Sequence, residues 1–413
     1  MENENLTLLA GGVTAPQGFM AGGAAAGIKA GGALDMAVLY SDCDLKAAGT
    51  FTTNVVKAAP VVWDSEKVKG GQSVRAVVVN SGVANACTGR QGMEYCQRTA
   101  EAAAAAFDIP PDSVLLASTG VIGRQLPIEK MEAGVAALKD AAGEGLEDGN
   151  SFAHAIMTTD TRDKQAAVLV KFKDGATCTV GGCCKGSGMI HPNMCTMLAF
   201  ITTDAKISRE LLQKALSEVV PDTFNMVSVD GDTSTNDTCL LLSSGLAGNA
   251  PIEEEGEDYE AFKAGVYTVL ESLAKQMARD GEGATRLFEV HVIGAQNKAD
   301  AKTIARSVVS SSLTKAALYG RDANWGRILC AMGYSGAKFV PEKVDLYFIS
   351  DRGRLQILAN GIDTGYSEEK ATEILSSDAV TCIADLHEGD AEATAWGCDL
   401  THEYVDINAD YRS

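Results

Sequence analysis

Residues 183–204, CCKGSGMIHPNMCTMLAFITTD, join a glycine-rich loop to an apolar segment with the composition of a β-strand. Glycine and proline in the loop favour turns over regular structure. The strand pattern begins at Thr196, directly after Cys195. One interpretation is a turn that leads into a core strand, and the other is that Thr196 is a nucleophile. The rest of the sequence has to decide between the two.

The composition describes an ordered globular protein. The chain has 413 residues, of which 46% are hydrophobic and 22% are charged, with 42 glycines. Its length indicates two or three domains. We expect a core domain over residues 1–205, a smaller α/β domain over 206–281 and a C-terminal α/β domain over 282–413.

The net charge of −20 is placed unevenly along the chain. Residues 1–195 carry 16 basic and 20 acidic side chains, whereas residues 196–413 carry 19 basic and 35 acidic side chains. An acidic chain attracts neither nucleic acid nor an anionic membrane surface. No apolar run reaches the length of a membrane span, and no secretory or transit segment is evident. We therefore expect a soluble cytoplasmic protein that binds no nucleic acid and no membrane.

Cysteine and histidine spacing argues against metal sites and disulfides. The 11 cysteines are an odd number, and no pair has the C-x-x-C spacing of zinc or redox sites. The five histidines form no H-x-x-x-H or H-E-x-x-H cluster. The glycine-rich segment at residues 11–32 lacks the Lys-Ser or Lys-Thr of a phosphate-binding loop. We expect the cysteines of this chain to be reduced and the chain to bind no metal. We also expect no nucleotide to bind at residues 11–32.

Hydrophobic patterning predicts alternating strands and helices. A hairpin is predicted about Asp174-Gly175. The segments with the composition of strands are 34–42, 59–65 (APVVWDS), 74–82 and 114–120, and those with helical patterns are 91–107, 128–142, 208–219 and a long one that ends near Arg279.

A threonine hydroxyl becomes a useful nucleophile only beside a base. If the bond before Thr196 is cut, its own α-amine can be that base. A strained loop favours such a cut, in which the hydroxyl attacks the preceding carbonyl. Thr119-Gly120, at a strand end, could form an oxyanion hole, while Lys185 and Glu282 could pair with a carboxylate and an ammonium group. Taken alone, each has a plainer interpretation as a turn residue or a solvated charge.

The stretch KGSGMIHPNMCTMLAFITTDA resembles the self-cleavage signature of the ornithine acetyltransferase family, the bifunctional glutamate N-acetyltransferases of arginine biosynthesis. The resemblance covers essentially the whole chain. Its other blocks, in the family's order, are GVTAPQGF, AAGIK, NSGVANACTG, STGVIGRQLP, AIMTTDT, VDGDTSTNDT, DGEGATR, GRDANWGRI and INADYRS.

The resemblance implies a reaction and an assembly. The precursor would cleave itself between Cys195 and Thr196, giving an α chain 1–195 and a β chain 196–413 that associate as a heterotetramer. Acetyl would pass from N2-acetylornithine to Thr196 and then to glutamate, with no cofactor and no metal. In bifunctional members acetyl-CoA also acetylates the enzyme. No motif in this sequence separates the members that use acetyl-CoA from those that do not.

The resemblance also implies site residues and a fold. Thr119 and Gly120 match the oxyanion-hole pair. The substrate-contacting positions match Thr158 (with Thr159 as the neighbouring alternative), Lys185, Thr196, Glu282, Asn408 and Ser413. The implied fold is α/β, with a layered α-β-β-α architecture, a smaller inserted α/β domain and a C-terminal α/β domain.

One position departs from the family pattern, which commonly has Ala where this chain has Cys195. A thiol is only slightly larger than a methyl group, so the acyl shift should tolerate it, although the extent of cleavage stays open. Two alternatives also stay open. One is an aminopeptidase or amidase that uses the same Thr196, and the other is a non-enzymatic thiol-buffering or binding protein.

Overall fold

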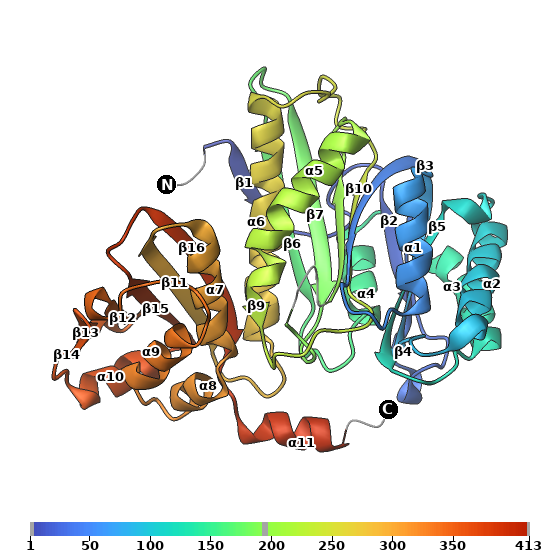
Figure 1. Ribbon diagram of the computed structural model, residues 1–413. Coiled ribbons are helices and arrows are strands. Elements are labelled where there is room, and N and C mark those ends of the chain that lie inside the picture. Colours follow the sequence, from blue (N-terminus) through green and yellow to red (C-terminus); the bar gives the residue numbers. More distant parts are fainter. Residues whose placement is uncertain (1–3, 192–196, 411–413) are drawn as a thin grey trace.

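The computed structural model describes residues 4–191 and 197–410 of the chain, and its described strands form two sheets flanked by helices (Figure 1). The first sheet contains nine of the described strands, of which eight follow one another along the sheet and the ninth, β2, pairs with β3. In sheet order these strands are β1 (Leu6–Leu9), β6 (Lys164–Lys171), β7 (Thr177–Lys185), β8 (Leu198–Thr203), β10 (Thr238–Ser243), β3 (Met36–Phe51), β4 (Val74–Val83) and β5 (Val114–Val121), with β2 (Met20–Ala24) beside β3.

The second sheet contains seven of the described strands, nearly all from the C-terminal part of the chain. In sheet order they are β14 (Ile362–Asp363), β13 (Gly353–Ala359), β12 (Asp345–Ser350), β15 (Ala379–Asp385), β11 (Leu287–Ala295), β16 (Ala391–Cys398) and β9 (Val227–Ser228).

Helices pack on the faces of both sheets. They are α1 (Ala59–Gly70), α2 (Gly89–Phe107), α3 (Ile128–Ala141), α4 (Leu146–Ala155), α5 (Arg209–Val219), α6 (Glu257–Arg279), α7 (Lys298–Ser310), α8 (Ser312–Tyr319), α9 (Trp325–Gly333), α10 (Glu368–Leu375) and α11 (His402–Asp410). Short 3-10 turns lie at Ala30–Gly32, Pro111–Ser113, Val220–Asp222, Phe224–Met226 and Pro341–Lys343. Within the described residues, no helix is both long enough and apolar enough to cross a membrane.

Helix α6 connects the two halves of the molecule. It packs against β6 and β7 of the first sheet and against β9, β11 and β16 of the second (Figure 1). Its buried side chains recur every three or four residues and so form one broad apolar stripe along the helix. One continuous apolar cluster therefore runs from Val168 on β6 through Phe262 and Leu270 to Val290 on β11.

Most of the elements expected from the sequence are confirmed. The β6–β7 hairpin turns about Asp174-Gly175, with Gly175 at a φ of 87°. The long helix ends at Arg279, as expected, with three acidic residues in its first turn. The four helical patterns correspond to α2, α3, α5 and α6.

The prediction of a strand at residues 59–65 is wrong, because this segment begins helix α1. Adjacent valines favour a strand, but Pro60 stands in the first helical turn, where its missing N–H costs nothing. Gly71 ends the helix in the left-handed conformation. The buried residues Val61, Asp64 and Val68 follow helical spacing, so packing outweighed local propensity.

The mixed α/β class is confirmed by this arrangement. The domain limits at 205 and 281 stay predictions. Across the first of them, β10 pairs in parallel with β8, so the first sheet includes residues on both sides of that limit.

Gly265 shows how closely α6 approaches the first sheet. A Cβ at this position would lie 2.4 Å from Val170 Cγ2. Replacing a helical glycine by alanine gains about 1 kcal/mol in propensity, whereas overpacking costs about 1–3 kcal/mol. We expect Gly265→Ala to lower the thermal unfolding midpoint. Gly326→Ala is the control, because its new Cβ meets only Asn324 Oδ1, at 3.5 Å, and should leave the midpoint unchanged or slightly higher. Equal effects of the two substitutions would contradict this account of the packing.

Candidate active site

Six of the residues predicted for the site line one cavity of about 130 Å³. They are Thr119, Gly120, Thr158, Lys185, Glu282 and Asn408. They come from five segments, and the last two, at Glu282 and Asn408, are 126 residues apart in sequence, so the fold has brought them together. Met197 and Leu198 also line the cavity. Cys195, Thr196 and Ser413 lie outside the described residues.

Thr119 and Gly120 lie at the end of β5, which pairs in parallel with β4. Gly120 has a φ of 127°, a backbone conformation that residues other than glycine rarely adopt. A Cβ there would lie 2.3 Å from the carbonyl carbon of Gly82. Both the conformation and the close approach of β4 therefore require glycine at this position.

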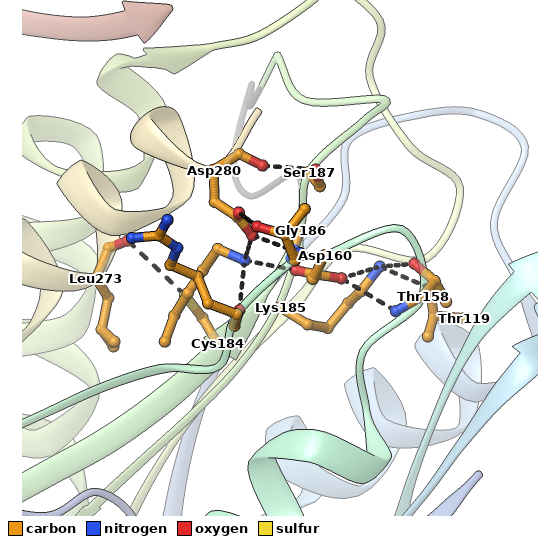
Figure 2. Close-up of polar contacts among 12 residues, drawn as sticks. Thr119, Thr158, Asp160, Cys184, Lys185, Gly186, Ser187, Leu273 and Asp280 are labelled. Atoms are coloured by element: carbon orange, nitrogen blue, oxygen red, sulfur yellow. Dashed lines mark hydrogen bonds and ion pairs between the residues drawn. The ribbon is translucent and has the colours of Figure 1, made fainter. Parts of the chain in front are cut away.

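Lys185 ends β7 and points its ammonium group at two hydroxyls (Figure 2). Its Nζ donates to Thr158 Oγ1 at 2.8 Å and to Thr119 Oγ1 at 3.2 Å. Since the lysine occupies a lone pair of the Thr119 oxygen, the hydroxyl hydrogen of Thr119 remains available for another acceptor. Thr158 and Thr159 both line the cavity, and the contact with Lys185 is made by Thr158.

Burial is the largest influence on Lys185 and lowers the pKa of its side chain. Asp160, with Oδ2 3.9 Å from Lys185 Nζ, opposes this effect, as do Glu282 and Asp237. Lys164 adds to the lowering by repulsion. The charge on Lys185 thus depends on the carboxylates around it.

A buried lysine, Lys164, joins the segments that carry these residues. Its Nζ lies 2.7 Å from Asp160 Oδ1 and 2.6 Å from Asp280 Oδ2, and the side chain is 1% exposed. Burial alone would lower the pKa of Lys164, but Asp160 and Asp280 raise it. Burial alone would raise the pKa of Asp160, but Lys185 and Lys164 hold it below its usual value.

Asp160 also fixes the backbone around the site. Its carboxylate accepts from the backbone N–H of Gly186 at 2.7 Å and of Thr158 at 3.0 Å (Figure 2). Asp280 accepts from the backbone and hydroxyl of Thr161, and its carbonyl accepts from Ser187 Oγ at 2.6 Å. The segments 158–164, 185–188 and 280–282 are therefore held by one set of charges.

Glu282 contacts the loop that follows Lys185, at Ser187 and Gly188. Its backbone N–H donates to the Ser187 carbonyl at 2.9 Å, and its Oε2 accepts from Asn408 Nδ2 at 2.7 Å. A Cβ at Gly188 would lie 2.2 Å from Glu282 Oε2, so glycine makes room for the carboxylate. Asn408 lies on helix α11, near the C-terminal end of the chain, and lines the cavity from there.

Sequence reasoning missed the contribution of residues 234–237, which also line the cavity. Asn236 Nδ2 donates to the carbonyls of Ala84 at 2.6 Å and Ser118 at 2.7 Å, and so fixes the strand end just before Thr119. Asp237 is 1% exposed and adds a second carboxylate to the wall. The run TSTNDT between two apolar strands was the available signal, because so many polar residues exceed what a turn needs.

The cavity wall thus presents one ammonium group, two carboxylates and a hydroxyl with an available hydrogen. Such a set can bind a small molecule that carries both charges and can stabilise a developing oxyanion. Among the described residues, no three His, Cys, Asp or Glu side chains gather as metal ligands would.

Comparison with known proteins gives consistent matches over the chain. The model of the ArgJ family matches residues 20–413. The arginine biosynthesis bifunctional protein ArgJ of Symbiobacterium thermophilum is 52% identical over 407 residues, covering 98% of this chain and 99% of that protein. The protein of the same name from Thermotoga neapolitana is 50% identical over 399 residues, covering 96% and 99%.

A crystal structure of arginine biosynthesis bifunctional protein argJ from Bacillus halodurans is 48% identical, covers 51% of this chain and 98% of that chain, and has a TM-score of 0.49. The family match extends over nearly all of the sequence, and the identity to relatives of full length is about one half. This chain belongs to the ArgJ family.

Proposed function

We propose that this chain transfers acetyl from N2-acetylornithine to glutamate through an acetyl-enzyme on Thr196, giving ornithine and N-acetylglutamate. The observation that carries the proposal is the cavity in which Lys185, Glu282 and the Thr119-Gly120 pair meet beside Met197. The bifunctional arginine-biosynthesis relatives support the same acyltransferase activity. Acetyl-CoA is a second acetyl donor in this proposal.

The first step is self-cleavage of the precursor. The Thr196 hydroxyl attacks the carbonyl carbon of Cys195, and the amide nitrogen leaves as the new α-amine of Thr196. Water then hydrolyses the resulting ester, which frees the hydroxyl. The products are an α chain 1–195 and a β chain 196–413. The α-amine is then positioned as the base of the nucleophile, as in other amino-terminal threonine enzymes.

In acetyl transfer the Thr196 oxygen attacks the acetyl carbonyl, and the α-amine takes the hydroxyl proton. The negative charge develops on the acetyl oxygen, where the Thr119 hydroxyl hydrogen and the Gly120 backbone N–H are proposed donors. Collapse of this intermediate breaks the C–N bond, and the departing ornithine amine takes the proton back. The glutamate amine then attacks the acetyl ester by the same steps in reverse.

Substrate recognition in this proposal uses the charges of the wall. Lys185 binds the α-carboxylate that both substrates carry, and Glu282, held by Asn408, faces an ammonium group. Thr158 orients Lys185 through its hydroxyl, and Ser413 completes the contacts with substrate. No cofactor and no metal takes part.

The proposal extends to assembly, compartment and architecture. Two α and two β chains form a heterotetramer in the cytoplasm. The four-layer α-β-β-α arrangement and the domain limits at 205 and 281 are part of the same proposal.

The reaction itself is tested by assaying purified protein with N2-acetylornithine and glutamate. We expect N-acetylglutamate and ornithine in equal amounts, because glutamate rather than water resolves the acetyl-enzyme. Quantitative mass spectrometry of both products and of acetate measures this. Acetate release without N-acetylglutamate would instead establish the aminopeptidase or amidase alternative.

Self-cleavage is tested by intact mass spectrometry. We expect two fragments from the wild type, divided between Cys195 and Thr196, and one full-length chain from Thr196→Ala, which has no hydroxyl. Thr196→Ser keeps a hydroxyl and should still cleave. Cys195→Ala should cleave at least as completely as the wild type. A divided chain from Thr196→Ala would rule out this nucleophile.

The oxyanion hole is tested at Thr119. Thr119→Val removes the hydroxyl but keeps the shape of the side chain, and loss of one such donor costs about 10²–10³ in kcat. We expect KM to stay within a few-fold, because the hydroxyl acts on the developing charge. Thr119→Ser should retain most of the activity. Steady-state kinetics of the three proteins provides the measurement, and an unchanged kcat for Thr119→Val would remove Thr119 from this role.

A further inference from the structure

A second cavity lies against one face of helix α7 and has a volume of about 540 Å³. None of the residues that line it is acidic, although the chain carries 55 acidic and 35 basic residues. Its lining residues are His191, Pro221, Asn225, Met226, Lys302, Thr303, Arg306, Ser307, Ser310 and Tyr334.

The cations of this cavity are Lys302 and Arg306, which stand one helical turn apart on α7. Asp222 lies outside the lining and pairs with both Lys302 and Lys298, so one carboxylate is shared by two ammonium groups. The lining itself therefore carries two cationic side chains and no acidic one.

Arg306 contributes a guanidinium group that burial has already partly stripped of water, since burial lowers its pKa. Its Nη2 lies 3.0 Å from His191 Nε2. Burial and Arg306 lower the pKa of His191 to about 4, so the ring is neutral at pH 7 and adds no charge. Because arginine only donates, His191 Nε2 is the acceptor, and Nδ1 donates to Ser228 Oγ at 3.1 Å.

Hydroxyl groups and an aromatic ring complete the lining. Thr303, Ser307 and Ser310 each donate to a backbone carbonyl, so their oxygens face the cavity as acceptors for ligand hydroxyl or amino groups. The Tyr334 side chain stands at the rim with 62% of its surface exposed. A ring in that position offers a flat face on which a heterocyclic base can stack.

We propose that this cavity binds a phosphate-bearing nucleotide, with the phosphate on Lys302 and Arg306 and the base against Tyr334. Arginine and lysine bind phosphate through charge-assisted hydrogen bonds, and the volume lies in the range of small-molecule sites. Coenzyme A and free nucleotides both carry this chemistry. A role as a site for the nucleotide part of acetyl-CoA rests on the proposed function. Its position favours that role, because Ile190 lines the active-site cavity and the next residue, His191, lines this one.

Calorimetric titration of the purified protein with CoA, ADP and inorganic phosphate tests the proposal. We expect CoA or ADP to bind more tightly than phosphate, and the affinity to fall as salt rises. Tighter binding of CoA than of ADP assigns the cavity to CoA, and equal binding assigns it to nucleotides in general. No binding of either nucleotide, or no gain over phosphate, overturns the proposal.

Three substitutions locate the binding. Lys302→Gln and Tyr334→Ala should each weaken nucleotide binding at least tenfold. Lys298→Gln is the matched control, because Lys298 shares Asp222 but does not line the cavity, and it should bind as the wild type does. Equal loss in Lys298→Gln and Lys302→Gln, or no loss in either cavity variant, would overturn the assignment.

The same variants separate this proposal from the acetyl-transfer proposal. Transfer from N2-acetylornithine should proceed at the wild-type rate in all three, since none of the three residues lines the active-site cavity. Loss of nucleotide binding with transfer retained supports a separate site. Loss of both together in a variant with an unchanged unfolding midpoint contradicts it. Wild-type protein that binds nucleotide yet transfers no acetyl group would overturn only the proposed function.

Discussion

The geometry of the active-site cavity depends on one buried ammonium group, that of Lys164. Moving a charge out of water costs several kcal/mol, and the cost is recovered only when partners satisfy it closely. Here Asp160 and Asp280 lie 2.7 and 2.6 Å away, from segments more than a hundred residues apart. Neither carboxylate can move without leaving a buried charge uncompensated. The constraint thus fixes the distance between the two segments that carry Lys185 and Glu282.

The same charges also act on the pKa of Lys185. A lysine buried alone loses its proton readily, and a neutral amine would attract a substrate carboxylate weakly. Asp160 opposes this effect of burial on the Lys185 pKa with a negative charge 3.9 Å away, while Lys185 and Lys164 together hold the pKa of Asp160 below its usual value. Lys164 also repels Lys185 and so lowers its pKa, whereas Asp160 raises it. The two threonine hydroxyls that accept from Lys185 then fix its direction toward the cavity.

The sequence predicted the residues of this site better than it predicted their supports. Thr119, Lys185 and Glu282 stand in glycine-rich blocks, and the resemblance to a family, rather than the composition of those blocks, singled them out. Lys164 and Asn236 escaped notice, because a lysine in a strand pattern and an asparagine in a polar run look solvated until the fold buries them. The error at α1 has a similar cause, since two valines carry a local strand signal that Pro60, Gly71 and the buried helical face outweigh. Local pattern reports propensity, whereas these features depend on contacts distant in sequence.

The proposed reaction places opposite demands on one wall of the cavity. N2-acetylornithine carries a side-chain ammonium group, which Glu282 and Asp237 attract, whereas glutamate brings a side-chain carboxylate that they repel. Both substrates share the α-carboxylate, so Lys185 can serve each of them unchanged. The wall therefore needs a group that accepts from one side chain and donates to the other. The Asn408 amide has both capacities, and its Nδ2 already donates to Glu282. Asn408 lies on α11, so in this proposal the C-terminal helix supplies the group that contacts the side chains of both substrates.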